Sequence, residues 1–294
     1  MKSKIGKLIL SILGVLAIVF VLGWWLGRRA ADVAYYTDAT LPLVIAHQGG
    51  DGLWPGETMY AFQHASDLGV DVLEMDLHIS RDGVPVLMHD ETVDSTTDGT
   101  GEVGSLTLDE LKQLDAGYDW TDDDGATYPY RGQGITVATL EEVFQAFPGQ
   151  RMLIEIKQVD QPINGPFCDL IHQYTMQDKV MVAAFNDPVM DLWREDCPDV
   201  ATSGARDEVT NFVFLSKVGL GFLVSPRYQS LQVPEESSGT TVMTQRFVRA
   251  AHRRNLHVEP WTIDDPDTMR EFIDWGVDGI ITDRPDLMLE ALGR

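Results

Sequence analysis

The chain is poor in basic residues and in cysteine, and both shortages exclude classes of protein. Its 294 residues include 22 Lys and Arg against 46 Asp and Glu, so the formal net charge is −24 at pH 7. Binding to DNA or RNA needs clustered cations that neutralise phosphates, so no nucleic-acid partner is expected. Two cysteines cannot build a disulfide-dense scaffold or a four-thiolate zinc site. Cys168 and Cys197 can either pair in an oxidising compartment or remain two buried thiols.

The first 29 residues differ in composition from the rest of the chain. They contain five basic residues and no acidic one, and residues 8–26 are almost wholly apolar. As a helix this run is about 28 Å long, close to the hydrocarbon thickness of a bilayer. We therefore expect residues 1–29 to be a membrane anchor, with a cleaved signal sequence as the alternative. The rest of the chain is then expected in the periplasm or outside the cell.

The remaining residues alternate between strand-like and helix-like segments. Residues 30–41 are expected to be a linker to one domain, residues 42–294, whose apolar runs of strand length indicate a parallel α/β architecture. If the run 84–88 is set aside as a hairpin strand, eight runs remain and predict a (β/α)8 TIM barrel, with a doubly wound open sheet as the alternative. Residues 91–137 break the alternation and are expected to form an insertion after the second strand. The expected barrel strands are residues 43–46, 70–75, 152–156, 180–184, 200–202, 220–224, 256–259 and 279–281.

Charged, imidazole and indole side chains stand at the ends of these apolar runs. Glu74 and Asp76 are two residues apart, so both side chains point to the same side of a strand. The carboxyl ends of parallel barrel strands meet at one rim, where barrel enzymes build their active sites. Burying so many charges without partners is costly, so we expect a bound cation among them. The residues at the run ends are His47, Glu74, Asp76, His89, Glu155, Lys157, Trp261 and Asp283.

The residue types in this group indicate hydrolysis of a phosphate ester. Three of its carboxylates, Glu74, Asp76 and Glu155, offer hard oxygen ligands, which suit Mg²⁺ or Ca²⁺ better than zinc. Lys157 adds a positive charge for an anionic substrate. His47 and His89 can divide the removal and the delivery of a proton between them.

Several short motifs resemble those of the glycerophosphodiester phosphodiesterase family, over roughly residues 43–292. They are His47-Gln48-Gly49-Gly50, Pro55-Gly56-Glu57-Thr58, Leu73-Glu74-Met75-Asp76, Asp82-Gly83, His89-Asp90, Thr97-Asp98-Gly99-Thr100-Gly101, Glu155-Ile156-Lys157 and Thr282-Asp283-Arg284-Pro285. The resemblance implies a barrel with an insertion after the second strand and cleavage of a glycerophosphodiester into glycerol 3-phosphate and an alcohol. It also implies that His47 and His89 are the acid–base pair, that Glu74, Asp76 and Glu155 hold one divalent cation, and that Lys157 contacts the phosphate.

Two positions depart from the family pattern. The family usually has Arg after the first catalytic histidine and Asn before the motif threonine, whereas this chain has Gln48 and Glu57. An amide cannot replace the charge of a guanidinium group that binds phosphate. We therefore expect Arg227, which follows the expected sixth strand, to supply the missing cation. Gln48 and Trp261 are also expected to contact the substrate.

Three functions remain open from the sequence. The first is metal-dependent hydrolysis of glycerophosphodiesters. The second is the release of a headgroup from lysophospholipids, as a lysophospholipase D does, because an anchored enzyme can reach such lipids. The third is a barrel that binds phosphodiesters without catalysis, which the presence of both histidines disfavours.

Overall fold

The computed structural model describes residue 14, residues 27–159 and residues 163–294. The apolar run expected to form a membrane anchor therefore lies outside the described residues, apart from Gly14. In the part of the chain that is described, no helix is both long enough and apolar enough to cross a membrane.

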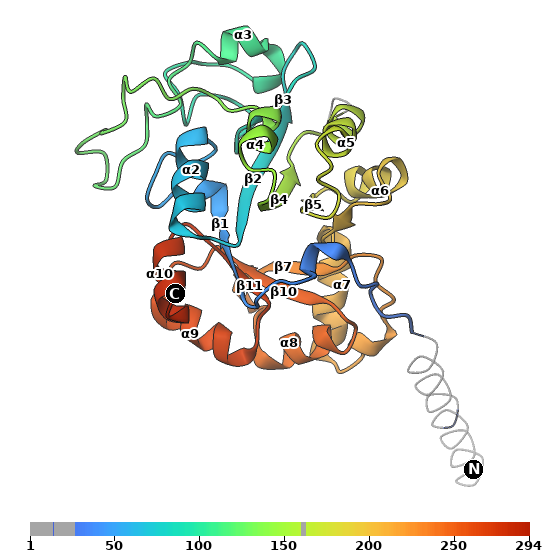
Figure 1. Ribbon diagram of the computed structural model, residues 1–294. Coiled ribbons are helices and arrows are strands. Elements are labelled where there is room, and N and C mark those ends of the chain that lie inside the picture. The colour runs from blue at the N-terminus through green and yellow to red at the C-terminus, as the bar shows by residue number, and fades with distance from the viewer. Residues whose placement is uncertain (1–13, 15–26, 160–162) are drawn as a thin grey trace.

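Within residues 27–159 and 163–294, eight parallel strands curl into a barrel (Figure 1). They are β1 (Leu43–Ala46), β2 (Val72–Ile79), β4 (Arg151–Ile156), β5 (Val180–Ala183), β6 (Ala201–Thr202), β7 (Ser230–Pro234), β10 (His257–Trp261) and β11 (Gly279–Thr282). Six of them pair in the order β11-β1-β2-β4-β5-β6, and β7 pairs with β10. A parallel bridge between Ser203 and Ser230 joins β6 to β7. The Asp278 amide donates to the Val258 carbonyl at 2.9 Å and joins β10 to β11.

Helices surround the barrel and bury the outer faces of its strands (Figure 1). They are α2 (Met59–Leu68), α4 (Leu140–Ala146), α5 (Asn164–Gln173), α6 (Asp187–Asp196), α7 (Arg206–Lys217), α8 (Gln245–His252), α9 (Pro266–Trp275) and α10 (Pro285–Leu292). In β1, Leu43 and Ile45 belong to the cluster inside the barrel, whereas Val44 and Ala46 belong to the cluster under the helices. Both faces of β1 are thus buried, which explains why its sequence is a continuous apolar run.

One expected strand is wrong. Residues 220–224 contain the 3-10 helix η4 (Gly221–Leu223), and the sixth barrel strand is β7, which begins at Ser230. The sequence of β7 alternates polar and apolar residues because Ser230 and Gln232 face the barrel interior. There they donate to the buried carboxylate of Glu259 at 2.7 Å and 3.1 Å.

The segment between β2 and β4 has its own small core. As expected, its first part is a hairpin strand, β3 (Pro85–Leu87), which pairs antiparallel with β2. The 3-10 helix η3 (Val103–Ser105) and α3 (Leu108–Leu111) follow within residues 91–137. Val103 and Leu111 pack with residues of and around β3 in a separate hydrophobic cluster. The Trp120 indole donates to the Asp51 carbonyl at 2.7 Å and fastens the insertion to the loop after β1.

The stretch that was expected to be a linker forms part of the barrel. It contains the 3-10 helix η1 (Ala34–Tyr36), and Tyr35 is buried against Leu43 and other residues of the barrel interior. The Tyr36 hydroxyl donates to Glu259 at 2.7 Å, and its ring stacks on His257 with the ring centroids 3.5 Å apart. Residues 30–37 therefore close the end of the barrel at which the strands begin.

The two cysteines form a disulfide, which resolves the alternative that the sequence left open. Cys168 lies in α5 and Cys197 directly follows α6, so the bond ties these neighbouring helices together. Disulfides persist mainly in oxidising compartments. The bond therefore suggests an extracytoplasmic location for the domain.

Candidate active site

The predicted site residues converge at the carboxyl ends of the barrel strands. His47 directly follows β1, Glu74 and Asp76 lie in β2, and Glu155 lies near the end of β4. A cavity of about 820 Å³ opens over them. Its lining includes six of the predicted residues, namely His47, Glu74, His89, Glu155, Lys157 and Trp261. Asp76 is only 1% exposed and contacts Lys157 at the edge of this group.

Two carboxylates and one ammonium group form the centre of the site. Asp76 and Glu155 are register partners on the adjacent strands β2 and β4, so their side chains lie next to each other. Lys157 Nζ is 3.1 Å from Asp76 Oδ1 and 3.1 Å from Glu155 Oε2. Burial, together with repulsion between the acids, raises the pKa of Asp76 to about 6 and the pKa of Glu155 to about 7. The site therefore carries more buried negative charge than Lys157 alone neutralises.

Glu57 adds a fourth carboxyl group to those of Glu74, Asp76 and Glu155. Its Oε1 accepts a hydrogen bond from the Asp76 amide at 2.9 Å. Its Oε2 is buried and has no hydrogen-bond partner among the described residues. Burial raises the pKa of Glu57 well above its usual range, and the neighbouring Asp76 and Glu74 raise it further. The sequence did not show that this departure from the family motif lies in contact with the acidic cluster.

The loop after β1 is shaped by glycine. Gly49 has φ of +81°, and a Cβ on it would lie 2.9 Å from the Phe62 ring, so no other residue fits this turn without strain. The turn directs the backbone amide of Gln48 toward Glu74 Oε2, to which it donates a hydrogen bond at 2.7 Å. It also places the imidazole of His47 over the cavity, with its Nε2 4.0 Å from Glu74.

Each of the two histidines is held by a carboxylate. His47 Nδ1 lies 2.6 Å from Asp283 Oδ1, and His89 Nδ1 lies 2.8 Å from Asp90 Oδ1. The Ser95 hydroxyl donates to the other oxygen of Asp90. With Nδ1 engaged in this way, Nε2 of each ring is the nitrogen left for a substrate. Burial lowers the pKa of His47, but nearby carboxylates outweigh this effect and raise the pKa to about 10.

Of two further residues expected to bind substrate, Gln48 lies at the site and Arg227 does not. Gln48 Nε2 lies 3.4 Å from Asp76 Oδ2, so its amide contacts the acidic cluster of the site. The guanidinium of Arg227 forms ion pairs with Asp191 and Glu208 and does not line the cavity. Because β7 begins at Ser230, Arg227 precedes the sixth strand, and the structure does not place it at the catalytic rim. The expectation that it replaces the missing cation is not supported.

A second, smaller cavity meets the first at the two histidines. Its volume is about 460 Å³, and His47 and His89 line both cavities. Polar residues predominate in its wall, and several of them come from the insertion, including Asp119, Trp120 and Thr121. The insertion therefore completes the site, a role that its irregular sequence did not reveal.

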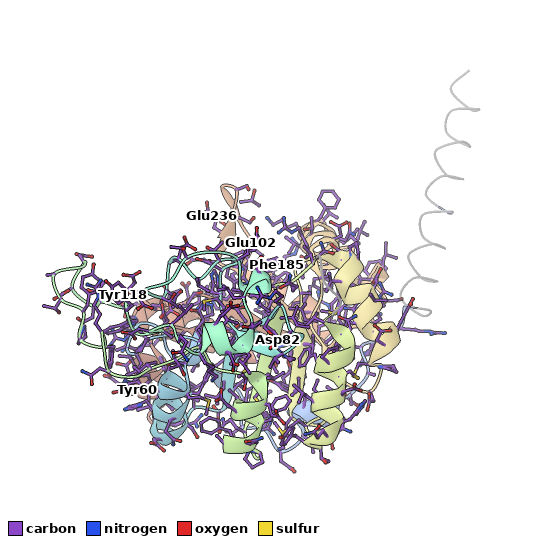
Figure 2. All side chains as sticks on the ribbon, turned by 90° about the horizontal axis from the view of Figure 1, so that it is seen from above. Tyr60, Asp82, Glu102, Tyr118, Phe185 and Glu236 are labelled. Carbon is purple, nitrogen blue, oxygen red and sulfur yellow. A yellow bond between two sulfur atoms is a disulfide. The ribbon has the colours of Figure 1, made fainter. Side chains whose placement is uncertain are left out.

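The larger cavity continues into an apolar arm that the sequence did not predict. Val213 and Phe214 of α7 form one wall, and Phe185, which follows β5, forms another. The Phe185 and Trp261 rings meet edge to face with centroids 5.8 Å apart. The hairpin of β8 (Glu236–Ser237) and β9 (Thr240–Thr241) borders the same arm. Figure 2 labels Glu236 on this hairpin, which projects from the molecule.

Comparisons with known proteins agree with this architecture. The family model described as "Glycerophosphoryl diester phosphodiesterase family" matches residues 47–287. A glycerophosphodiester phosphodiesterase of Caldanaerobacter subterraneus subsp. tengcongensis is 32% identical over 262 residues, which cover 86% of this chain and 98% of that protein.

Solved structures share the fold. The glycerophosphoryl diester phosphodiesterase domain of a Mycobacterium tuberculosis protein matches with a TM-score of 0.74 at 21% identity, covering 86% of this chain and 99% of that chain. An Oleispira antarctica phosphodiesterase, solved with the product sn-glycerol-3-phosphate, matches with a TM-score of 0.70 at 24% identity, covering 90% of this chain and 100% of that chain. The chain therefore belongs to the glycerophosphoryl diester phosphodiesterase family and is an enzyme of that class.

Proposed function

We propose that this site hydrolyses glycerophosphodiesters to glycerol 3-phosphate and an alcohol, using His47 and His89 as the acid–base pair. The arrangement of the two imidazoles supports this proposal most directly. Both face the same two cavities, and each has its Nδ1 fixed by a carboxylate. A phosphodiester bound across the junction of the cavities would present its two ester oxygens to different histidines.

The donor chemistry of the acidic cluster suits one divalent cation, Mg²⁺ or Ca²⁺, and we propose that Glu74, Asp76 and Glu155 hold it. All donors are carboxylate oxygens, the ligands that these hard cations prefer. Burial raises the pKa of all three groups, and such groups favour a bound cation that offsets their mutual repulsion. When bound, the cation would polarise the phosphoryl oxygens and stabilise negative charge that develops on them.

The two histidines, His47 and His89, then divide the proton transfers between them. One imidazole Nε2 removes the proton from the attacking oxygen as that oxygen bonds to phosphorus. The other imidazole delivers a proton to the alcohol oxygen as its bond to phosphorus breaks. Asp283 and Asp90 hold the rings and stabilise the imidazolium form, while Lys157 offsets part of the phosphate charge. The same scheme serves attack by water or by the glycerol 2-hydroxyl.

The two cavities differ in the part of the substrate that they fit. The smaller, polar cavity suits a glycerol moiety, because hydroxyl groups there can hydrogen-bond to its side chains. The larger cavity suits the alcohol. Its apolar wall favours a second candidate function, in which the substrate is a lysophospholipid and Phe185, Phe214 and Trp261 contact its acyl chain.

We also propose that residues 1–29 anchor the enzyme to a membrane, with the barrel in the periplasm or outside the cell. The length and apolarity of residues 8–26 support the anchor. The disulfide between Cys168 and Cys197 supports an oxidising location for the barrel.

A substrate panel tests the activity. The full chain in mild detergent is assayed with glycerophosphocholine and with a long-chain lysophosphatidylcholine, after EDTA treatment and after addition of Mg²⁺ or Ca²⁺. Hydrolysis is expected only with metal, and the preferred substrate decides between the two candidates. His47→Ala and His89→Ala are each expected to lower kcat by about 100-fold or more. His64→Ala, a histidine on α2, is the matched control. No hydrolysis with any added metal, or full activity of both variants, would reject the proposal.

A further inference from the structure

Basic residues are concentrated in one part of this acidic chain. Residues 206–254 contain seven Lys and Arg and four Asp and Glu, whereas all other residues from position 30 onward contain ten basic and 42 acidic residues. This stretch includes α7, η4 and α8, which follow one another around the barrel (Figure 1). One side of the domain is therefore electropositive relative to the rest.

Large apolar side chains are exposed on the same side. Phe214 is 66% exposed, Val218 is 55% exposed and Leu223 is 38% exposed. Phe214 and Val218 are four residues apart at the end of α7, so they lie next to each other on one helical face. Exposed apolar residues in such a group typically mark a surface that contacts another phase or molecule.

Unpaired cations lie among these side chains. Lys217 stands between Phe214 and Val218 in the sequence, and a guanidinium nitrogen of Arg246 lies 3.2 Å from where a Cβ of Gly219 would be. Within the described residues, no carboxylate is at ion-pair distance from Lys217 or Arg246, although the chain has twice as many acidic as basic residues. We call Phe214, Lys217, Val218, Leu223 and Arg246 the α7 face.

The chain enters the barrel domain beside this face. The Arg28 amide donates to Ser225 Oγ at 3.2 Å, two residues beyond Leu223. A guanidinium nitrogen of Arg254 donates to the Arg28 carbonyl. The apolar run expected to cross the membrane ends at residue 26, and two residues span at most about 7 Å. A bilayer reached by that run would therefore lie close to the α7 face.

We propose that the α7 face rests on a lipid bilayer with anionic headgroups. Phe214, Val218 and Leu223 enter the boundary between headgroups and acyl chains, while Lys217 and Arg246 contact lipid phosphates. This combination of apolar and basic side chains is typical of surfaces that lie in the membrane interface. The acidic remainder of the domain is repelled by the same headgroups, so the two effects together set one orientation.

This orientation has a consequence for access to the larger cavity. Phe214 and Lys217 belong both to the α7 face and to the lining of that cavity. The apolar arm therefore opens toward the bilayer, and an amphiphile can enter it without crossing water. The docking itself does not depend on the proposed catalytic activity.

Lipid-specific fluorescence quenching tests the docking. Val218→Trp and the control Leu68→Trp are introduced separately into the full chain, which is reconstituted in phosphatidylcholine vesicles containing phosphatidylglycerol. Leu68 is 40% exposed at the end of α2, on a different side of the barrel (Figure 1). The emission that each variant adds to that of the wild type is compared in plain lipid and in lipid brominated near the top of its acyl chains. We expect about two-fold quenching of the added emission at position 218 and none at position 68.

A charge-reversed variant tests the electrostatic part. Lys217→Glu combined with Arg246→Glu should reduce the quenching at position 218 in anionic vesicles and leave it unchanged in pure phosphatidylcholine. Equal quenching at positions 218 and 68 would overturn the proposal. So would a tryptophan at position 218 that is shielded from aqueous iodide yet unquenched by brominated lipid, because a second copy or another part of the chain would then cover the face.

Discussion

The contact between His47 and Asp283 allows a direct test of the proposed acid–base role of His47. His47 Nδ1 lies 2.6 Å from Asp283 Oδ1, and both side chains are largely shielded from water. The substitution Asp283→Asn removes the charge and keeps the size of the side chain. The backbone amide of residue 283 is unchanged by the substitution. It still donates to Asp264 Oδ1 at 2.8 Å and holds the loop in place.

The expected magnitude follows from the type of hydrogen bond that is lost. A hydrogen bond to a charged group contributes about 1.5–3 kcal/mol, compared with about 1 kcal/mol for a neutral one. The carboxylates around His47 raise its pKa to about 10, so the ring is an imidazolium before the reaction, and the weaker contact loosens the position from which its Nε2 acts on the substrate. A loss of about 0.5–2 kcal/mol lowers kcat by about 2- to 30-fold.

The assay is steady-state hydrolysis of the preferred substrate by the full chain at saturating metal. The kcat of Asp283→Asn should fall as stated, while the metal concentration for half-maximal activity stays near the wild-type value. Asp286→Asn is the matched control, because Asp286 binds Arg284 in the next turn and does not line the cavities. A kcat within two-fold of wild type for Asp283→Asn, or an equal loss in the control, would refute the reasoning.

Three further predictions concern stability, and urea unfolding of the full chain in detergent checks each. Lys157→Met removes the ammonium group that lies between Asp76 and Glu155. The free energy of unfolding should therefore fall by about 3 kcal/mol in EDTA and by less with Mg²⁺. An equal loss in both conditions would contradict the assignment of a metal site. Tyr36→Phe removes a donor to buried Glu259 and should cost about 1–2 kcal/mol; no change would mean that the contact is not formed. Burial raises the pKa of Asp278, but the hydrogen bond with His252 and the nearby ring of His257 outweigh this effect and hold the pKa at about 2. The stabilisation by this carboxylate is therefore present above pH 4 and is lost as the pH falls toward 2, so Asp278→Asn should cost about 2 kcal/mol at pH 6 and almost nothing near pH 2; a constant difference would refute the assignment.

Much of the barrel was predictable because its strands are buried on both faces. Such strands are continuous apolar runs, and each is short enough to be distinguished from a helix. β7 escaped prediction because Ser230 and Gln232 face a polar group inside the barrel, so its sequence resembles that of an exposed segment. The error about Arg227 followed from this one, since its expected place depended on where the sixth strand ended.

The position of the side chains at the rim was predictable for a related reason, since strand ends fix where a side chain lies. The contact of Glu57 with the Asp76 amide depends on the path of a loop, and no local pattern reveals it. The apolar wall that α7 contributes to the larger cavity could not be predicted from the sequence for the same reason. Val213 and Phe214 read as ordinary helix residues until tertiary packing sets them beside the cavity.

Residues 30–37, which close the base of the barrel, determine where a protease can cleave the chain without destabilising the fold. Arg151 donates to the carbonyls of Tyr35 and Thr37 at 2.6 Å and 2.7 Å, and Glu259 accepts from Tyr36. A protease that cleaved near residue 40 would strip these partners from a buried acid and a half-buried guanidinium. If the proposed anchor holds the enzyme at a membrane, a form released by proteolysis keeps its fold only when it retains the chain from about residue 30 onward.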